Sequence, residues 1–304
     1  MKPLLSVIIL TYNNIHLLDR AFKSVVKQSY DNVQVIIADD GSFDVTKESI
    51  SEVIDKYDTS YQVVINVNER NLGTVRNYNN AIKIASGDII VPLACDDSFV
   101  DENVLENIVT HFETTGCLVC SALRKGEKTG AYLPREKDAN ILKKHDAPLL
   151  LSRLSFDNII SGATLYFRRD VFERYGFFDE KYVLVEDFPY VFHLVKEGVS
   201  ISFMDRVTIV YGQDGVSCLK GKRVGNQQVE DDKRKMLIED IGTSLELIKN
   251  KKMRRYIRLC VDIAKYPRRK FIMYLKYMDV AIYKVIRKIK APRESMFWIM
   301  YKGD

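Results

Sequence analysis

The sequence lacks several features by which large classes of protein are recognised. No stretch approaches the roughly 18 to 20 uncharged apolar residues that cross a bilayer, so we expect no membrane-spanning helix. Residues 1–5 lead directly into strand-like sequence with no cleavage site, so we expect no signal peptide. The five cysteines form no regular framework, and Cys117 and Cys120 lie in an apolar run without a second pair. We therefore expect core thiols in a reducing cytosol rather than a zinc or redox site.

Several nucleotide-binding and catalytic motifs are also missing. There is no G-x-G-x-x-G after the first strand-like run and no G-x-x-x-x-G-K-[ST], which disfavours a dinucleotide dehydrogenase or a P-loop enzyme. No serine lies in a nucleophile-elbow context. The four histidines show no metal-ligand spacing: His16, His111, His145 and His193.

Charge is distributed unevenly along the chain. The 304 residues are 46% apolar and 29% charged, which is typical of a soluble globular protein of one or two domains. Residues 1–250 carry 30 Lys and Arg against 37 Asp and Glu, whereas residues 251–304 carry 16 against 4. An acidic body is therefore followed by a strongly basic tail.

The first hundred residues alternate between strand-like and helix-like periods. Strand-like runs cover residues 6–10, 33–38, 61–67 and 88–94, and helical patterns cover 15–28, 44–57 and 72–86. Strands that alternate with helices at this spacing indicate parallel strands with crossover helices. The sequence therefore predicts an α/β sheet covered on both faces.

Polar groups follow three of these strands, where ligands bind in such sheets. Thr11 and Tyr12 follow the first run, Asp39-Asp40 ends the second, and Asp96-Asp97 follows the fourth. Two adjacent carboxylates repel unless a cation or hydrogen-bond donors compensate them. A divalent metal that faces an anionic group such as a diphosphate fits this pattern. A solvated start of a loop is the alternative.

Taken in order, these motifs resemble family 2 glycosyltransferases, which have the GT-A fold and invert the anomeric centre. The resemblance covers residues 4–205, and it implies a Rossmann-like, mainly parallel central sheet with flanking helices, to which the tail adds a helical extension. Many such enzymes assemble bacterial polysaccharides and other glycans. The segments that carry it are L-S-V-I-I-L-T-Y-N (5–13), I-I-A-D-D-G-S (36–42), N-L-G-T-V-R-N (71–77), L-A-C-D-D (93–97), I-S-G-A (160–163), G-F-F-D-E (176–180) and V-E-D (185–187).

The resemblance implies a binding site for a nucleotide-sugar donor, with a UDP- or dTDP-sugar expected. Asp39 would accept a hydrogen bond from the imide N–H of a uracil or thymine base, flanked by Thr11 and Tyr12. Arg76 would approach the donor with a fixed positive charge. The alternatives are that Asp39 belongs to a turn before a helix capped by Asp44, and that Arg76 is simply solvated.

The same resemblance gives Asp96-Asp97 the role of the metal-binding D-x-D-like element, with Mn²⁺ or Mg²⁺ as the cofactor. We expect Asp97 to bind the metal and Asp96 to contact the ribose as well as the metal. The metal would stabilise the leaving nucleotide diphosphate. Many relatives carry another acid two positions before the pair, where this chain has Ala94. Two acids still suffice for a metal that keeps several waters.

Glu186-Asp187 precedes a helix-like run and is implied to be catalytic. Asp187 would be the general base that deprotonates an acceptor hydroxyl, assisted by Glu186. A stabilising cap at a helix N-terminus is the alternative. The segment 160–163 would form part of the acceptor cleft, where Gly162 permits a close backbone approach or a bulge.

The basic tail lies outside the resemblance. At about 100° per residue, residues 271–289 place an apolar stripe on one helix face. The stripe consists of Phe271, Leu275, Met278, Ile282, Val285, Ile286 and Ile289, opposite Lys270, Lys276, Lys284, Arg287, Lys288 and Lys290. Such a helix suits an anionic membrane surface, and residues 253–265 show a similar split before Pro267. Alternatively, the stripe packs on the catalytic domain or on a partner subunit. No nucleic-acid partner is expected, because no recognised binding module is present.

We therefore expect a glycosyltransferase domain over residues 1–210, with a donor half (1–100) and an acceptor half (101–210), and a helical basic region over 211–304. The leading hypothesis is a metal-dependent enzyme that is cytoplasmic, lies peripherally on the inner face of the cell membrane, and extends a lipid-linked glycan. A nucleotidyltransferase on a related fold and a non-catalytic scaffold subunit are the alternatives.

Overall fold

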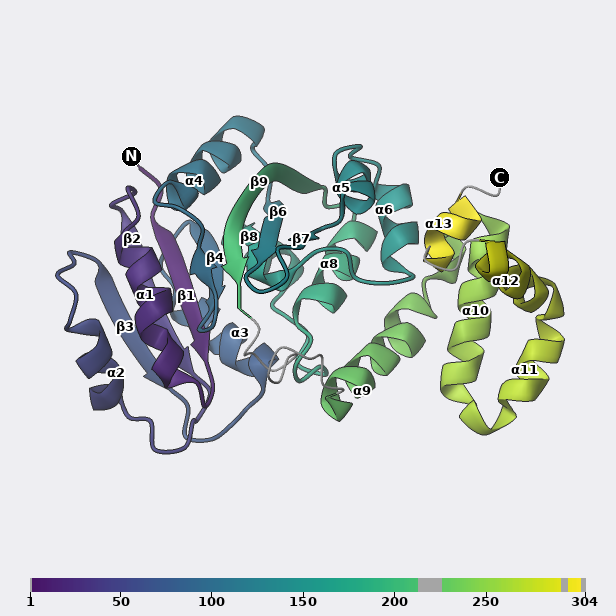
Figure 1. Cartoon of the computed structure of the whole chain (residues 1–304), viewed down its shortest axis with the longest axis horizontal. Coiled ribbons are helices and arrows are strands. Elements are labelled where there is room, and N and C mark those ends of the chain that lie inside the picture. Colours follow the sequence, from purple (N-terminus) through teal and green to yellow (C-terminus); the bar gives the residue numbers. More distant parts are fainter. Residues whose placement is uncertain (1, 213–225, 291–294, 302–304) are drawn as a thin grey trace.

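The computed structural model describes residues 2–212, 226–290 and 295–301, and within them a curled mixed sheet carries helices on both faces (Figure 1). The strand order is β3-β2-β1-β4-β8-β6-β9-β5, and β7 pairs with β6. The strands are β1 (Leu5–Thr11), β2 (Val33–Asp39), β3 (Gln62–Val67), β4 (Ile89–Ala94), β5 (Ser98–Phe99), β6 (Val119–Gly126), β7 (Tyr132–Leu133), β8 (Leu165–Arg168) and β9 (Ile201–Tyr211).

The first four strands are parallel, as the sequence predicts. Strand β1 lies between β2 and β4, with Leu5 opposite both Val33 and Ile89. The register places Thr11 opposite Asp39 at the carboxyl ends of β1 and β2. Strand β8 runs antiparallel to both β4 and β6, whereas β9 runs parallel to β6. The sheet is therefore parallel from β1 to β4 and mixed in the strands that follow.

Helices connect and cover these strands. In the body of the molecule they are η1 (Ile15–Leu17), α1 (Leu18–Val26), α2 (Lys47–Ile54), α3 (Thr74–Ile84), α4 (Val104–Thr115), α5 (Glu136–Leu142), α6 (Ala147–Leu154), η2 (Gly162–Thr164), α7 (Asp170–Tyr175) and α8 (Asp187–Lys196). The C-terminal elements are α9 (Gln227–Met236), η3 (Leu237–Ile241), η4 (Leu245–Leu247), α10 (Lys251–Lys265), η5 (Pro267–Arg269), α11 (Lys270–Lys276), α12 (Met278–Lys290) and α13 (Met296–Tyr301).

The pleat of β1 divides the core into two clusters. Val7 and Ile9 belong to one cluster together with Phe22 of α1. Ile8 points to the other face and joins a cluster that includes Val75 of α3. Both faces of β1 are apolar and covered. Polar side chains that could bind a ligand therefore lie at the ends of the strand.

One predicted helix start is wrong. Asp44 does not cap a helix, since it has a φ of 54° and lies before the helix begins. Thr46 is the N-cap of α2 instead: its side chain accepts a hydrogen bond from Ser49 N, and the Ser49 hydroxyl accepts one from Thr46 N. This reciprocal capping box satisfies two amides that Asp44 cannot reach.

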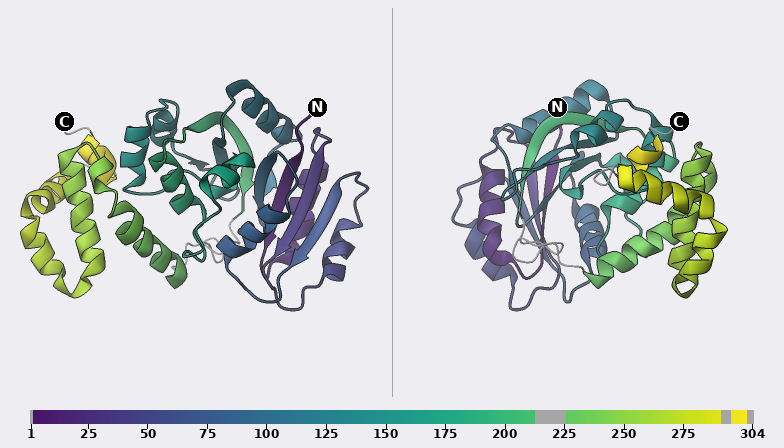
Figure 2. Two further views of the ribbon diagram at one scale, coloured as in Figure 1. Left: turned by 180° about the vertical axis from the view of Figure 1, so that it is seen from behind. Right: turned by 45° about the vertical axis from the view of Figure 1, so that its right-hand side comes forward.

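The C-terminal helices lie beside the sheet (Figures 1 and 2), and their buried residues join the same apolar cluster as α3 and α8. Helix α9 leads away from the body, and α10 buries one face, including Met253, Tyr256 and Ile257. The predicted helix over 271–289 is divided at Tyr277, which is buried and donates its hydroxyl to Asp262. In the described ranges, no helix has both the length and the apolar character needed to cross a bilayer.

The apolar stripe is exposed on α11 and α12. Its members from Phe271 to Ile286 are between 49% and 74% exposed, so they do not pack on the rest of the described chain. The alternative of packing on the catalytic domain is therefore wrong for this part of the stripe, whereas packing on a partner subunit stays open. Predictions for Arg287, Lys288, Ile289, Lys290 and Cys218 fall outside the side chains that the structure describes.

Candidate active site

A cavity of about 1210 Å³ opens at the carboxyl ends of β1 and β4. It extends from there past the start of α8 to helices α9 and α13. Six of the predicted site residues line this cavity, whereas Asp39 and Arg76 do not. The six are Thr11, Tyr12, Asp96, Asp97, Glu186 and Asp187.

The turn after β1 holds Thr11 and Tyr12. Asn14 Oδ1 accepts hydrogen bonds from Thr11 Oγ1 at 2.6 Å and from Tyr12 N at 3.0 Å. Asn13 lies between them with a φ of 54° and donates its N–H to Ser42 Oγ at 2.7 Å. The Tyr12 side chain is thereby left exposed at the cavity rim.

The acids at the end of β2 have local structural partners. Asp39 is fully buried, and it accepts hydrogen bonds from Ser42 N at 2.8 Å and from Ser42 Oγ at 2.5 Å. Asp40 does line the cavity, and it accepts the N–H groups of Leu72 and Gly73 at 2.8 and 2.9 Å. Asp40 therefore ties β2 to the loop before α3, a role that we did not predict. The base-binding role of Asp39 stays a prediction.

Arg76 lies on the exposed side of α3. Its Nε is 3.3 Å from Glu180 Oε2, and both side chains are about half exposed. Thr74, Asn77 and Tyr78 of the same helix line the cavity instead. The structure thus brings the start of α3 to the site but not Arg76, whose donor contact stays a prediction.

Asp96 and Asp97 lie together in the turn after β4, and both are buried. Asp97 Oδ1 accepts the N–H of Gly212 at 2.7 Å, whereas its buried Oδ2 has no hydrogen-bond partner among the described residues. Burial and the neighbouring Asp96 charge raise the pKa of Asp97 well above its ordinary value. Gly212 must lack a side chain here, because a Cβ would lie 2.1 Å from the Asp96 carbonyl oxygen.

Arg124 of β6 is a cationic lining residue that the sequence did not single out. Its guanidinium stacks 3.5 Å from the centroid of the Tyr211 ring. Its buried Nε has no hydrogen-bond partner among the described residues. Its positive charge opposes the rise in the pKa of Asp97. Arg124 therefore places a cation on the wall of the cavity close to the acid pair.

The donor set of Asp96 and Asp97 fits a divalent cation held together with an anionic ligand. Asp97 Oδ2 is a buried carboxylate oxygen with no partner in the described part of the chain, which is a costly arrangement unless a cation or donor completes it. The described residues contain no group of three or more acids, histidines or cysteines that would enclose a metal. One or two carboxylates with phosphate oxygens and waters are the usual ligands of Mg²⁺ at such sites.

Asp187 is held rigidly at the start of α8. Its Oδ2 accepts hydrogen bonds from Asn158 Nδ2 at 3.0 Å and from Gly162 N at 2.9 Å. Its Oδ1 accepts the N–H of Phe188 at 2.6 Å. Burial raises the pKa of Asp187, and these three donors oppose that rise because they stabilise the ionised form. Asn158 was not foreseen, since it lies 29 positions away along the chain.

Glu186 differs from its neighbour. Burial, followed by the charges of Asp187 and Asp232, raises the pKa of Glu186 to about 8. The surroundings thus differ within the pair: burial favours the protonated form of Glu186, whereas the three donors to Asp187 favour its ionised form. Gly162 packs closely here, since a Cβ would lie 3.0 Å from Glu186 Oε1 and 3.2 Å from Asp187 Cβ. The predicted close approach at Gly162 is confirmed, in a 3₁₀ turn rather than a bulge.

The family model described as "Glycosyl transferase family 2" matches residues 6–176, which is more than half of the chain. The chain belongs to glycosyltransferase family 2. The matched part contains the sheet edge with Asp39 and Asp96-Asp97, and it ends before Glu186-Asp187 and the C-terminal helices.

Curated family 2 relatives are similar over part of their length. A glycosyltransferase of Haemophilus influenzae, whose function is uncharacterised, is 28% identical over 201 residues, which are 62% of this chain and 57% of that protein. The GalNAc(5)-diNAcBac-PP-undecaprenol beta-1,3-glucosyltransferase of Campylobacter jejuni is 36% identical over 98 residues, 32% of this chain and 31% of that one. The chain thus spans little more than half of the first of these relatives.

Solved structures share the fold of this family 2 chain. S. aureus TarS 1-349 in complex with UDP-GlcNAc gives a TM-score of 0.58 at 19% identity, covering 87% of this chain and 73% of that one. The mannosyltransferase PcManGT of Pyrobaculum calidifontis, in complex with GDP-Man and Mn²⁺, gives 0.56 at 15% identity, covering 97% and 89%. At these identities the likeness establishes the GT-A fold, which confirms the fold expected from the sequence.

Proposed function

We propose that this family 2 chain is a metal-dependent, inverting glycosyltransferase that moves a sugar from a nucleotide diphosphate to a hydroxyl of a growing glycan. The observation that carries the proposal is the single cavity that joins Asp96 and Asp97 at one sheet edge to Asp187 at the start of α8. An acid pair suited to a metal and an oriented base then line the same cavity. Transfer requires this, because the donor diphosphate and the acceptor hydroxyl must be bound side by side.

The donor occupies the end of the cavity next to β1 and β4, within residues 1–100. Tyr12, exposed at the rim, flanks a uracil or thymine base, and Thr11 supports the turn that presents it. Asp39 accepts the imide N–H of the base once Ser42 yields one of its two hydrogen bonds. Arg76 reaches the donor after leaving Glu180, an exposed pair that costs little to break. The UDP-GlcNAc complex of TarS supports a UDP-sugar donor.

Asp97 Oδ2 and Asp96 hold Mn²⁺ or Mg²⁺, and Asp96 also contacts the ribose. The Asp97 oxygen that lacks a partner within residues 2–212, 226–290 and 295–301 supports this assignment, as does the Mn²⁺ complex of PcManGT. When bound, the cation supplies positive charge for the diphosphate that leaves. Arg124 adds a second positive charge on the same wall of the cavity.

Asp187 accepts the proton of the acceptor hydroxyl. The deprotonated oxygen forms a bond to the anomeric carbon as the bond from that carbon to the diphosphate oxygen breaks, and attack from the opposite face inverts the centre. Glu186, whose protonated form burial favours, donates a hydrogen bond to a sugar or acceptor oxygen. The bonds from Asn158 and Gly162 keep the ionised carboxylate of Asp187 aimed at the cavity.

The acceptor is a lipid-linked glycan, bound within residues 101–210 and by the helical region 211–304. Val229 and Lys233 of α9 and Trp298 of α13 line that end of the cavity. The exposed stripe, together with Lys270, Lys276 and Lys284 elsewhere on α11 and α12, suits an anionic membrane surface. The undecaprenol-linked acceptor in the name of the Campylobacter relative is consistent with this assignment. The enzyme would then act at the cytoplasmic face of the cell membrane.

The base and the metal are tested together with UDP- and dTDP-sugars and with an undecaprenyl-diphosphate-linked N-acetylhexosamine as the acceptor probe. We expect Asp187→Asn to lower transfer by about 10³-fold while a UDP-sugar still raises the melting temperature in the presence of Mn²⁺. The exposed Asp231→Asn serves as the control. If Asp187→Asn transfers sugar at the rate of the control, the base assignment is overturned. If the UDP-sugar raises the melting temperature equally with Mn²⁺ and with a chelator, the metal assignment is overturned.

Membrane contact is tested with vesicles that contain phosphatidylglycerol. We expect the wild-type chain to sediment with them and a Phe271→Ser/Leu275→Ser/Val285→Ser variant to remain in the supernatant, because three exposed apolar anchors are lost. Zwitterionic vesicles are the control for charge. Sedimentation that the triple variant retains would exclude the stripe as the anchor.

A further inference from the structure

The segment between α7 and α8 delivers Glu186 and Asp187 to the cavity, and a C-terminal helix holds it from behind. Asp232 of α9 is almost fully buried. Its Oδ2 accepts three consecutive backbone N–H groups, from Val183 at 3.0 Å, Leu184 at 2.7 Å and Val185 at 3.2 Å. Three successive amides that converge on one oxygen form an anion-binding nest, and here the anion belongs to the chain itself.

The carboxylate of Asp232 is itself fixed from its own helix. Gln228, one turn earlier on α9, donates its Nε2 to Asp232 Oδ1 at 2.9 Å. Asn226 caps α9 by accepting the N–H of Gln228. Both carboxylate oxygens are thus in use, and the side chain has one orientation.

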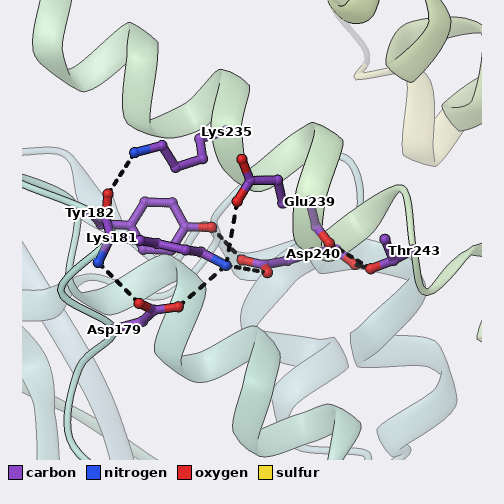
Figure 3. A network of polar contacts seen from close by, with 7 residues as sticks. All are labelled: Asp179, Lys181, Tyr182, Lys235, Glu239, Asp240 and Thr243. Carbon is purple, nitrogen blue, oxygen red and sulfur yellow. Dashed lines mark hydrogen bonds and ion pairs between the residues drawn. The ribbon is translucent and has the colours of Figure 1, made fainter.

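A second set of contacts fixes the residues just before the nest (Figure 3). Lys235 of α9 donates to the carbonyl oxygen of Lys181 at 2.6 Å. Asp240 of η3 accepts Lys181 Nζ at 2.8 Å and the hydroxyl of Tyr182. Asp179 lies on the other side of the Lys181 ammonium at 3.2 Å. Residues 181–185 are therefore held against α9 and η3 along their whole length.

The donor half holds the opposite side of this segment. The N–H of Val75, in the first turn of α3, donates to the carbonyl oxygen of Val183 at 3.1 Å. Gly73 packs so closely on Val183 that a Cβ would lie 2.6 Å from its side chain. Asn79 also exchanges hydrogen bonds with the backbone of Phe178 at 2.9 and 3.1 Å. The segment is a strap held between α3 and α9.

We propose that Asp232 is a positioning residue for transfer: by gathering the N–H groups of Val183, Leu184 and Val185, it sets where Glu186 and Asp187 enter the cavity. The inference rests on the proposed role of Asp187 as the base. It assigns a part in catalysis to a C-terminal helix that the family match does not reach. The negative charge of Asp232 also favours the protonated form of Glu186.

The test compares Asp232→Asn with Asp231→Asn, the same change at the adjacent, exposed position of α9. In Asp232→Asn, the side chain would present one oxygen and one N–H₂ group to three backbone N–H groups that need an anion. We therefore expect residues 183–185 to shift. We expect kcat to fall about 10- to 100-fold, as small misplacements of reacting groups do, while the donor KM stays within about twofold of wild type, because donor contacts lie elsewhere. Asp231→Asn should match wild type in both constants.

A double variant separates positioning from general damage. Since Asp232 acts through Asp187, Asp232→Asn should cost little further activity in an Asp187→Asn background. Additive losses, or a kcat of Asp232→Asn equal to that of Asp231→Asn, would overturn the inference while leaving the base assignment intact. Wild-type activity in Asp187→Asn would overturn both. If the lipid-linked probe is not accepted, metal-dependent hydrolysis of the UDP-sugar replaces transfer as the readout.

If Asp232→Asn does not fold, the Gln228→Met variant tests the positioning role of Asp232 instead. It removes the bond to Asp232 Oδ1 while leaving the charge and the nest in place. We expect kcat to fall about two- to fivefold with an unchanged donor KM. An unchanged kcat in a folded Gln228→Met variant would count against a positioning role.

Discussion

The two acid pairs of the cavity have opposite designs. Asp96-Asp97 leaves one buried oxygen without a partner among the described residues. In Glu186-Asp187, one acid is fully hydrogen-bonded, and burial raises the pKa of the other to about 8. Under the proposed function a cation completes the first pair, whereas hydrogen-bond donors and the proton that burial favours on Glu186 complete the second. Similar dipeptides therefore have different electrostatic surroundings because of the atoms around them.

Among the changes that distinguish the two pairs, we expect the largest effect from removing the negative charge of Asp97. In Asp97→Asn, an N–H₂ group or a neutral oxygen would replace the carboxylate, and charge for the leaving diphosphate would be lost. We expect transfer to fall about 10²-fold and stimulation by Mn²⁺ to disappear, measured as rate against Mn²⁺ concentration.

The matched change in the other pair, Glu186→Gln, should keep its Mn²⁺ dependence. An Asp97→Asn variant with the wild-type response to Mn²⁺ would contradict the division of roles between the pairs.

A smaller effect should follow from adding a methyl group behind each pair. In Gly212→Ala the new Cβ would lie 2.1 Å from the Asp96 backbone oxygen, which cannot yield without moving the acids. We expect Mn²⁺ affinity, measured from rate or thermal shift, to weaken about tenfold.

Gly162→Ala is the counterpart at the second pair. Its Cβ would lie 3.0 Å from the end of the Glu186 side chain, which can move slightly. Mn²⁺ affinity should stay at the wild-type value while kcat falls modestly. Equal losses of Mn²⁺ affinity in both variants would mean that the pairs do not act separately.

The smallest expected effect concerns stability and pH. Because the pKa of Glu186 is raised to about 8 in the folded chain, the folded state binds a proton that the unfolded chain releases above its ordinary pKa of 4.5. Stability from this group is therefore full below pH 4.5 and is lost as the pH rises towards 8. Glu186→Gln escapes that loss, and we expect it to be more stable than wild type at alkaline pH, by a margin that narrows towards pH 5.

Urea unfolding at pH 5 and at pH 9 measures this difference. Glu197→Gln, an exposed change at the end of the same helix, should show no such pH dependence. A gain for Glu186→Gln that is equally large at both values of pH would show that burial does not perturb the Glu186 carboxyl.

Much of the structure of residues 1–100 could be predicted from the sequence, because local periods determine it. The runs at 6–10, 33–38, 61–67 and 88–94 became β1 to β4 with ends shifted by at most one residue, so Asp96 and Asp97 lie where the pattern predicts. Short-range hydrogen bonds modified the details. Ser42 takes both oxygens of Asp39, and Thr46 rather than Asp44 caps α2.

The rest depends on contacts between residues far apart in the chain. Asn158 reaches Asp187 from 29 positions away, and Asp232 reaches Val183 from 49. No local pattern marks either residue, since each is an ordinary polar side chain in its own segment. The basic tail shows the same limit: α10 buries its apolar face while α11 and α12 expose theirs, although all three have similar amphipathic sequences.

The nest around Asp232 also bears on how modular this protein is. Its body and its C-terminal helices look separable in outline (Figure 1), yet α9 supplies the only described acceptor for the amides of Val183, Leu184 and Val185. A chain cut after β9 would retain both acid pairs but would leave these amides without that partner. A C-terminal region exchanged between relatives would have to bring an equivalent carboxylate. Helix α9 and η3, which both hold residues 181–185, therefore belong structurally with the sheet rather than with the helices that follow them.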